Sequence, residues 1–386
     1  AIGNKTWTVD SSNVPAQRNL GNVLERAYAI GRTNTTSIQS TLQTPFRERT
    51  NRAVALRESG INLTTTASYD HEAVRALVAD IAAYVTRDPV DAQIQSFDYA
   101  TRTFSFTESQ PGVTLDQDLL YERVTAALDR WESGVTVTVD PIVTEPAVTK
   151  DELVASFGLV AAYTTETTND SNRNTNIDLA CQAINGTALM PGETFSFNQA
   201  TGQRTTEKGY KSAGAIAAGQ SIEEVGGGIC QVSSTLFNAV ARANLEIVSR
   251  SPHAWPSTYV NIGEDATVNW PNLDFQFKNN TKSPIFIITY YKNRRMSAEI
   301  WGMSLGEGVT IDLQSTIIKT IDPPSEVKYE LNTDLPYGTE KTTVKARTGY
   351  VVETEKVWYK DGQETRRELL HTSNYRAYQQ VIEYNY

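Results

Sequence analysis

The residue best placed to do chemistry in this chain is Cys230, which follows directly on a run of glycines. Residues 226–234 read Gly-Gly-Gly-Ile-Cys-Gln-Val-Ser-Ser, and apolar residues then recur at helical spacing at Val232, Leu236 and Val240. A cysteine in the first turn of a helix lies among backbone N–H groups that lack helical partners, near the positive end of the helix dipole. Both favour the thiolate, so the pattern predicts a nucleophilic thiol.

A thiol nucleophile needs a general base, and the chain has 3 histidines: His71, His253 and His371. Only His253 is close to Cys230 in sequence, just after residues 245–248, which read as a short strand. A helix leading away from Cys230 and a strand running back would bring His253 beside the thiol. His71 precedes an apolar-periodic run and His371 lies in a polar turn, so we expect both to be structural.

A third group should orient the imidazole, and Asp265 is our candidate, although Asp274 or a backbone carbonyl would serve as well. The backbone N–H groups around the cysteine could hold the oxyanion of a tetrahedral intermediate. We assign this role to Gly228, Ile229 and Gln231.

The neighbours of the cysteine and the histidine are candidates for binding substrate. We expect Ser233, Ser234, Arg250 and Trp255 to line the cleft. Two of them have a second interpretation, since Ser234 fits the polar face of a helix and Trp255 fits a core.

The second cysteine, Cys181, shares an apolar helical face with Ile177, Ala180 and Ile184, so we expect it to be a small buried residue. A disulfide between Cys181 and Cys230 is possible, but it would leave no free thiol to act as the nucleophile. The chain has no Cys-x-x-Cys pair and no cluster of histidines, so we expect neither a metal nor another cofactor.

Residues from about 153 to 302 resemble a VanW domain. The resemblance rests on the Gly-Gly-Gly-Ile-Cys-Gln core and on matching segments at residues 173–177, 191–198, 209–210, 252–253, 265–267 and 274–279. Some members of this family are understood as cysteine L,D-transpeptidases that form 3-3 cross-links in peptidoglycan. Carried over, that activity falls on Cys230 and His253. The Ser-His-Gly-Cys motif of YkuD-type L,D-transpeptidases is absent from this sequence.

The resemblance implies peptidoglycan stem peptides as substrates, carbapenem-type compounds as inhibitors, and a thioester acyl-enzyme on Cys230. Two alternatives use the same residues differently. The protein would be a cysteine peptidase if water replaced the acceptor amine, and a wall-binding protein without catalysis if Cys230 were buried away from any cleft.

The expected fold class is α+β, in three parts. Residues 1–148 form an α+β domain that resembles the peptidoglycan-binding regions preceding VanW domains, or a spacer. Residues 149–305 form the catalytic domain, an antiparallel sheet with helices packed on it. Residues 306–386 form an extended all-β module that resembles a five-glycine domain, with a hairpin turn at Lys360-Asp361-Gly362. We expect residues 150–305 to hold the catalytic geometry and the C-terminal module to serve wall attachment or spacing.

Composition narrows the setting. The net charge of −10 and a pI near 5.0 argue against a nucleic-acid partner. The sequence contains no run of 18 apolar residues, so no membrane-spanning helix is predicted. Because the chain starts at Ala1, we expect any membrane link to be an N-terminal anchor that has been removed. Together with the resemblance, this indicates an extracytoplasmic protein facing the bacterial cell wall.

Overall fold

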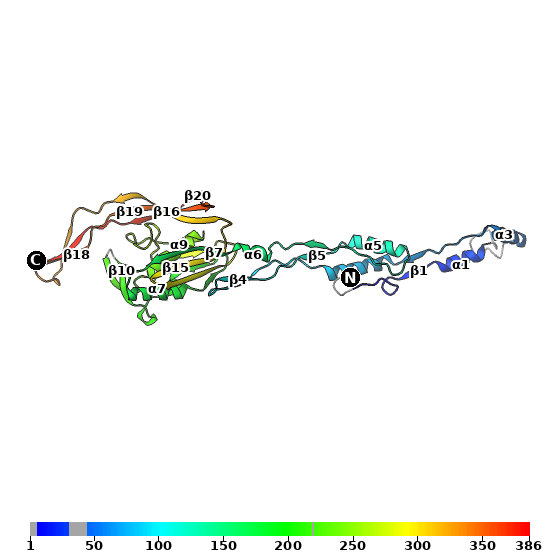
Figure 1. Ribbon diagram of the computed structural model, residues 1–386, viewed down its shortest axis with the longest axis horizontal. Helices are drawn as coiled ribbons and strands as arrows, with labels where there is room; N and C mark the ends of the chain where they lie inside the picture. Colours follow the sequence, from blue (N-terminus) through cyan, green and yellow to red (C-terminus); the bar gives the residue numbers. More distant parts are fainter. Residues whose placement is uncertain (1–5, 31–44, 218–219) are drawn as a thin grey trace. The chain divides into compact units, whose positions relative to one another are not determined.

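The computed structural model describes residues 6–30, 45–217 and 220–386, which form two compact units (Figure 1). Unit 1 consists of residues 1–92 and 108–149, and unit 2 of residues 93–107 and 150–386. The α+β class that the sequence predicts is confirmed, because helices and mainly antiparallel strands occur in both units.

Unit 1 is built around two packed helices, α4 (His71–Val85) and α5 (Gln117–Asp129). Each begins at an aspartate whose carboxylate accepts backbone N–H groups of the first turn, as N-caps do. Their apolar faces enclose a small core of Val14, Val74, Val78, Leu120 and Val124. The other elements of unit 1 are β1 (Ala16–Arg18), α1 (Leu20–Ala29), α3 (Phe46–Ser59), β2 (Ala67–Tyr69), β5 (Gly112–Thr114) and β6 (Ile142–Thr144).

Two segments of this region differ from what their sequence patterns indicate. The proline-containing segment 141–146 reads as a linker, but its residues 142–144 form β6, which pairs antiparallel with β5. The alternating segment 134–139 reads as a strand, but it forms none. Alternation alone does not supply the neighbouring strand whose carbonyls and N–H groups a strand needs.

Unit 2 is centred on an antiparallel sheet of four strands, ordered β7–β15–β14–β8. Helices α7 (Ser171–Ile184) and α9 (Ile229–Arg242) pack against it. The strands are β7 (Phe157–Glu166), β8 (Thr187–Leu189), β14 (Ile285–Lys292) and β15 (Arg295–Met303), and the short helix α6 (Lys150–Ser156) precedes β7.

A hairpin from the N-terminal half of the sequence belongs to unit 2. Its strands, β3 (Ile94–Asp98) and β4 (Thr103–Phe106), place Phe97 against Phe286 of β14 at a centroid distance of 4.8 Å. Arg102, at the hairpin turn, pairs with Glu299 of β15 at 2.8 Å. Aromatic packing and an ion pair therefore attach residues 93–107 to the sheet, a contact that the sequence does not reveal.

Helix α9 is the central element of unit 2. From Ile229 to Ala241 every residue except Cys230 is buried, because the helix lies between the four-stranded sheet and strand β16 (Val309–Ile321). A helix buried on all sides is a core helix. The one residue of α9 before Arg242 that keeps partial exposure is thus the proposed nucleophile.

The remaining elements of unit 2 that precede the C-terminal module are shorter. They include the hairpin of β10 (Ser212–Ala217) and β11 (Gln220–Val225), and a sheet ordered β12–β13–β9. These last strands are β9 (Thr194–Ser196), β12 (Glu246–Ser249) and β13 (Gln276–Lys278), accompanied by α8 (Phe197–Thr201) and the 3-10 turn η1 (Thr206–Lys208).

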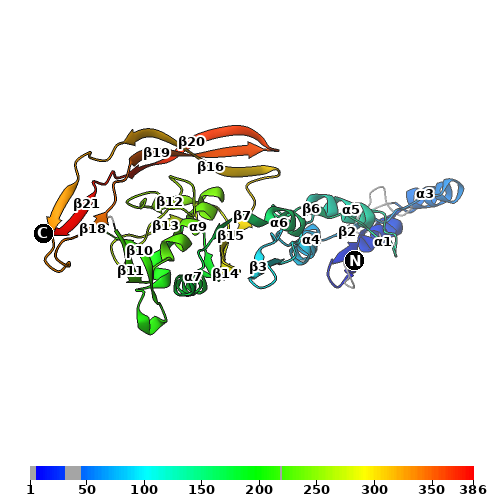
Figure 2. The same cartoon turned by 60° about the vertical axis from the view of Figure 1, so that its left-hand side comes forward.

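The C-terminal module is all β, as the sequence predicts. Its main sheet is ordered β16–β19–β20, with β19 (Gly349–Lys360) and β20 (Gln363–Tyr375) forming a long hairpin that is seen clearly in Figure 2. At the predicted turn, Asp361 and Gly362 have φ of 51° and 81°, the left-handed backbone such hairpins need. A second sheet is ordered β17–β21–β18, from strands β17 (Lys328–Leu331), β18 (Thr339–Val344) and β21 (Val381–Asn385).

The glycine run before Cys230 is required by packing, and Gly227 shows this most directly. A Cβ at Gly227 would lie 2.3 Å from the carbonyl oxygen of Ala213 in β10. We predict that Gly227→Ala lowers the free energy of unfolding by about 1–3 kcal/mol, since the backbone must move to admit the methyl group. Denaturant unfolding measures this. Gly214→Ala is the matched control, because its Cβ would meet nothing within 4 Å, and it should unfold as the wild type does. Equal stability of the two variants would contradict the close approach.

Candidate active site

Cys230 lies in the first turn of α9, as predicted. Gly228 is the N-cap and has φ of 103°, a left-handed conformation that favours glycine. The thiol is part-buried, 3.4 Å from the carbonyl oxygen of Val268 and 3.5 Å from the hydroxyl of Thr267. The segment after Asp265 therefore forms one wall beside the sulfur.

His253 and Asp265 come together as the sequence predicts. The Nδ1 of His253 is 2.5 Å from Oδ2 of Asp265, and the same oxygen accepts the backbone N–H of His253 at 2.7 Å. This leaves Nε2 for other partners, and the hydroxyl of Tyr259 is 3.4 Å from it. The carboxylate thus fixes both the position of the histidine backbone and the orientation of its ring.

The three groups shift one another's proton affinities. Burial by itself raises the pKa of the Cys230 thiol, but hydrogen bonding to His253 and the positive charge there, with Thr267 and the Val268 backbone, lower that pKa to about 7. Burial lowers the pKa of His253, yet Asp265 and the Cys230 thiolate raise it to about 10. At neutral pH these shifts favour a thiolate paired with an imidazolium, the reactive form of a cysteine nucleophile.

Two backbone N–H groups in the turn that leads into Cys230 have no acceptor in the described structure and could serve an oxyanion. The N–H of Ile229 is bonded to the carbonyl of Gly226, and that of Gln231 to the carbonyl of Gly228. Within the described part of the chain, no acceptor binds the N–H of Gly228 or of Cys230. Of the three groups assigned from the sequence, Gly228 is therefore the one left available, and the nucleophile's own N–H joins it.

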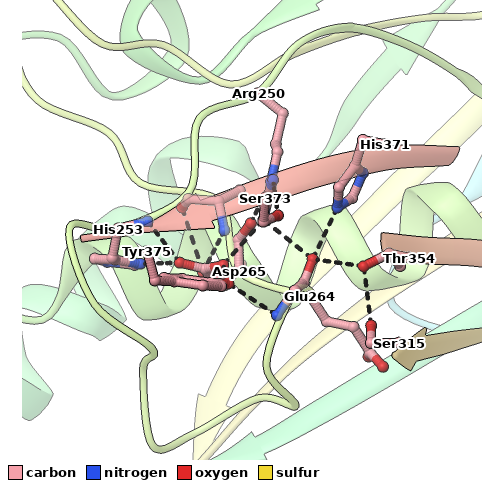
Figure 3. Close-up of polar contacts among 12 residues, drawn as sticks. Arg250, His253, Glu264, Asp265, Ser315, Thr354, His371, Ser373 and Tyr375 are labelled. Carbon is pink, nitrogen blue, oxygen red and sulfur yellow. Dashed lines mark hydrogen bonds and ion pairs between the residues drawn. The ribbon is translucent and has the colours of Figure 1, made fainter. Parts of the chain in front are cut away.

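Asp265 is fully buried, and a C-terminal residue helps to hold it. Its Oδ1 accepts hydrogen bonds from Nη2 of Arg250 at 2.9 Å and from the hydroxyl of Tyr375, at the end of β20, at 2.6 Å (Figure 3). Burial raises the pKa of Asp265, but the hydrogen bonds and charges of His253 and Arg250, together with Tyr375, bring it down to about 2. The carboxylate is thus charged at every pH near neutrality.

The loop that carries Asp265 is also held by the C-terminal module. The carbonyl of Gly263 accepts from Arg250, from His371 at 2.8 Å and from Thr354 at 3.2 Å, and its N–H donates to Tyr375 at 2.8 Å. Burial and the charge of Arg250 lower the pKa of His371 to about 4, so its ring is neutral and Nε2–H donates. His371 therefore supports the fold, but it lies on strand β20 and not in the polar turn that its sequence suggests.

The four residues proposed to bind substrate lie in the interior. Ser233 and Ser234 have 0% exposure, and both donate to the carbonyl of Ala266, which ties α9 to the Asp265 loop. Arg250 is engaged by Asp265 and by Ser373. Trp255 packs on Tyr378 and under Arg347. Because each side chain is buried among protein groups, we give all four a structural role instead of a substrate contact.

The remaining candidates are separated from the chemistry. Cys181 is a free thiol buried in α7, where burial raises its pKa, and Cys230 is free as well. Asp274 binds the hydroxyl of Ser196 and the backbone N–H of Asn198, so it does not orient His253. Three residues that contact the catalytic group are not predicted from the sequence: Thr267, Tyr259 and Tyr375. Thr267 directly follows the Asp265-Ala266 pair, but only the folded chain reveals the other two.

A cavity of about 570 Å³ elsewhere in unit 2 is lined by residues of β7, β14 and β15 and includes none of Cys230, His253 or Asp265. Among the residues that the structure describes, no group of three or more histidine, cysteine or acidic side chains is arranged to hold a metal ion. No helix in the described ranges is long and apolar enough to cross a membrane.

Comparison with known families agrees with this architecture. Residues 172–301 match the model of the family described as "VanW like protein", residues 7–136 that of a "Putative peptidoglycan binding domain", and residues 314–385 that of the G5 domain. The fold and site thus define a three-part protein whose Cys-His-Asp group lies in the VanW-like region. The chain belongs to the VanW-like family.

Two relatives support that assignment. The uncharacterized protein YoaR of Bacillus subtilis (strain 168) is 32% identical over 299 residues, covering 77% of this chain and 94% of that protein. The vancomycin B-type resistance protein VanW of Enterococcus faecalis (strain ATCC 700802 / V583) is 33% identical over 115 residues, covering 28% of this chain and 42% of that protein. A solved G5 domain from an IgA1 protease, at 22% identity, covers 20% of this chain and 92% of that chain, but its TM-score of 0.14 is too low to carry an argument. The family and the two flanking domains make the protein an extracytoplasmic, cell-wall-associated one.

The pKa shift of Cys230 gives a direct prediction. Alkylation by iodoacetamide should increase with pH through a midpoint near 7, below the value of about 8.5 for an ordinary thiol, and should be lost as the pH falls below it because only the thiolate reacts. In His253→Ala the burial remains but the stabilising charge is gone, so the midpoint should rise above about 8.5. Mass spectrometry of quenched samples measures both rates. Cys181→Ser should leave the midpoint unchanged, and an unshifted midpoint in His253→Ala would contradict the pairing.

Tyr375 should act as a positioning residue, because its hydroxyl is one of two side-chain donors to Oδ1 of Asp265. In Tyr375→Phe the buried carboxylate loses one of its donors and no longer holds the imidazole of His253 in a fixed position beside the thiol. The alkylation midpoint of Cys230 should therefore move up, and its rate at neutral pH should fall by about tenfold. Tyr378→Phe is the matched control, since Tyr378 packs on Trp255 through its ring. An unchanged pH profile in Tyr375→Phe would show that the hydroxyl only supports folding.

Proposed function

We propose that the protein is a cysteine L,D-transpeptidase, which forms 3-3 cross-links between peptidoglycan stem peptides through a thioester on Cys230. The observation that carries the proposal is the Cys230–His253–Asp265 group at the start of α9, where the paired charges lower the pKa of the thiol to about 7. The VanW-like family and the two flanking domains supply the wall context, and the activity known for some VanW proteins supplies the reaction.

In the first half-reaction, the thiolate of Cys230 attacks the carbonyl carbon at the L-centre of the donor stem. The carbonyl oxygen becomes an oxyanion, for which the N–H groups of Cys230 and Gly228 are open donors. As the tetrahedral intermediate collapses, the bond to the terminal D-residue breaks and its nitrogen takes a proton from Nε2 of His253. The products of this step are a thioester and a free D-amino acid.

In the second half-reaction, a side-chain amine of a neighbouring stem attacks the thioester carbon. His253, now neutral, accepts the proton that the amine loses, an amide bond forms and the thiolate of Cys230 leaves. Asp265 keeps the imidazole in one orientation through both halves, because its Oδ2 holds Nδ1 and the backbone N–H of the same histidine. Water in place of the amine would make the protein a peptidase.

A non-catalytic role in wall binding fits these observations less well. Cys230 is the part-exposed residue of an otherwise buried helix, and its thiol interacts with a histidine that a buried carboxylate orients. Burying a charged carboxylate is costly unless it is paired, and here Asp265 is paired with Arg250 while its other oxygen orients the imidazole of His253. The same geometry would be unnecessary in a domain that only recognises peptides.

The proposal predicts an acyl-enzyme. A soluble donor tetrapeptide without an acceptor should add the mass of the acyl fragment to Cys230, and a carbapenem should load the same residue. Cys230→Ala and His253→Ala should each reduce loading by at least about a hundredfold, the scale of general acid–base catalysis, because one removes the nucleophile and the other the proton carrier. Intact-protein mass spectrometry with peptide mapping measures this.

Cys181→Ser is the control and should load within a few-fold of the wild type, because Cys181 is buried in α7. Adding an amine acceptor should discharge the adduct faster than buffer alone does. If the adduct is discharged at the same rate with and without the amine, and only hydrolysed stem peptide is formed, the protein is a peptidase. An absence of adduct with every donor, in protein whose Cys230 still alkylates, would contradict it.

A further inference from the structure

Two arginines lie against the glycine turn that leads into Cys230, and the mechanism above uses neither. Arg173, in the first turn of α7, lies over Gly228: an added Cβ there would be 2.7 Å from Cγ of Arg173 and 3.1 Å from its Nη1. Its Nη2 donates to the side chain of Gln231 at 2.8 Å. The guanidinium is therefore held next to the first turn of α9.

Arg204 approaches the same turn from another segment. An added Cβ at Gly226 would be 3.0 Å from Cβ of Arg204, and Nη2 of this arginine donates to Asn198 at 2.8 Å. Its guanidinium carbon lies 5.6 Å from the centre of the Phe197 ring. The side chain is thus oriented by an amide and an aromatic ring, without an acid.

Neither arginine has an acidic partner among the described residues. Asp170 is near Arg173, but its carboxylate caps α7 by accepting backbone N–H groups. Asp274 is near Arg204, but its oxygens accept from Ser196, Asn198 and Gln276. Burial lowers the pKa of Arg204, with partial opposition from the charges of Tyr210, Cys230 and Asp274. In a chain with a net charge of −10, two unpaired guanidiniums beside the nucleophile are unusual.

Both arginines also keep a buried donor without an acceptor. The Nε–H groups of Arg173 and Arg204 are shielded from solvent, and neither meets an acceptor in the described structure. A buried, unmatched donor carries a free-energy cost that a bound acceptor would remove. The planar fork of a guanidinium suits a carboxylate, which can accept two parallel hydrogen bonds.

We infer that Arg173 and Arg204 form a carboxylate-binding site beside Cys230, which holds a carboxylate of the donor peptide while the thiolate attacks. The inference rests on the proposed function for the identity of the donor. The glycines at 226 and 228 are part of this site, because any side chain there would meet the two arginines. A stem peptide has a carboxylate on its terminal D-residue, and a second one on the side chain at the L-centre where that residue is a diamino diacid.

A pair of simple alkylating reagents tests the site without any stem peptide. Iodoacetate carries a carboxylate and iodoacetamide is its neutral counterpart, so the ratio of their rates with Cys230 reports carboxylate binding and cancels changes in thiolate fraction. We expect this ratio to be at least about tenfold higher in the protein than for free glutathione. The positive charge of His253 also attracts iodoacetate. The test is therefore how much the rate ratio falls when each arginine is replaced.

The ratio should fall by about fivefold or more in Arg173→Gln and in Arg204→Gln, and Arg204→Lys should keep part of it because the charge remains. Arg295→Gln is the control: Arg295 is exposed and paired with Glu166, so the ratio should not change. A retained iodoacetamide rate shows that each variant still folds around Cys230. Equal ratios in the wild type and both glutamine variants would overturn the inference.

A second arm uses wild-type protein alone, and so does not depend on variants that fold. Donor peptides are compared with the terminal carboxylate free, with it amidated, and with the side-chain carboxylate amidated. Slower loading of Cys230 with one amidated donor supports the site and identifies which carboxylate it binds. Equal loading by all three overturns it. If no donor loads while the iodoacetate preference persists, the proposed function fails and the carboxylate site stands.

Discussion

The arrangement of the site depends on one buried carboxylate. Asp265 receives the imidazole and the backbone N–H of His253 on one oxygen, and Arg250 and Tyr375 on the other. A charge removed from water is tolerated only when its oxygens are matched in this way. Once it is matched, the carboxylate makes the histidine strongly basic, and the basic histidine makes the thiol acidic. The reactivity of Cys230 therefore depends on Asp265, which acts on the thiol through His253.

That carboxylate also connects parts of the chain that sequence comparison assigns to different domains. Tyr375, Ser373 and His371 lie on β20, within the residues that match the G5 domain, yet they bind Asp265, Arg250 and the loop at Gly263. The expectation that residues 150–305 hold the catalytic geometry by themselves omits these contacts. A module of a kind usually considered for attachment thus forms part of the support behind the active site.

The sequence predicts the local features well and the long-range ones poorly. Cys230 and the start of α9 follow from a glycine run and an apolar period, both local signals. His253 and Asp265 could be named because histidines are few and the segments match a family. By contrast, four residues look available in sequence but are buried: Ser233, Ser234, Arg250 and Trp255. Their partners come from the Asp265 loop and from segments more than a hundred residues away. The attachment of residues 93–107 to the sheet and the role of Tyr375 are missed for the same reason, since neither has a pattern within its own segment.

In the function proposed here, this site joins two stem peptides through Cys230. The most direct test is to incubate the purified protein with a defined disaccharide-tetrapeptide and to separate the muropeptides by liquid chromatography with mass spectrometry. We predict a dimer linked 3-3, with release of one terminal D-amino acid per cross-link, and no dimer with Cys230→Ala. An unchanged tetrapeptide, or a dimer that still forms in Cys230→Ala, would contradict it.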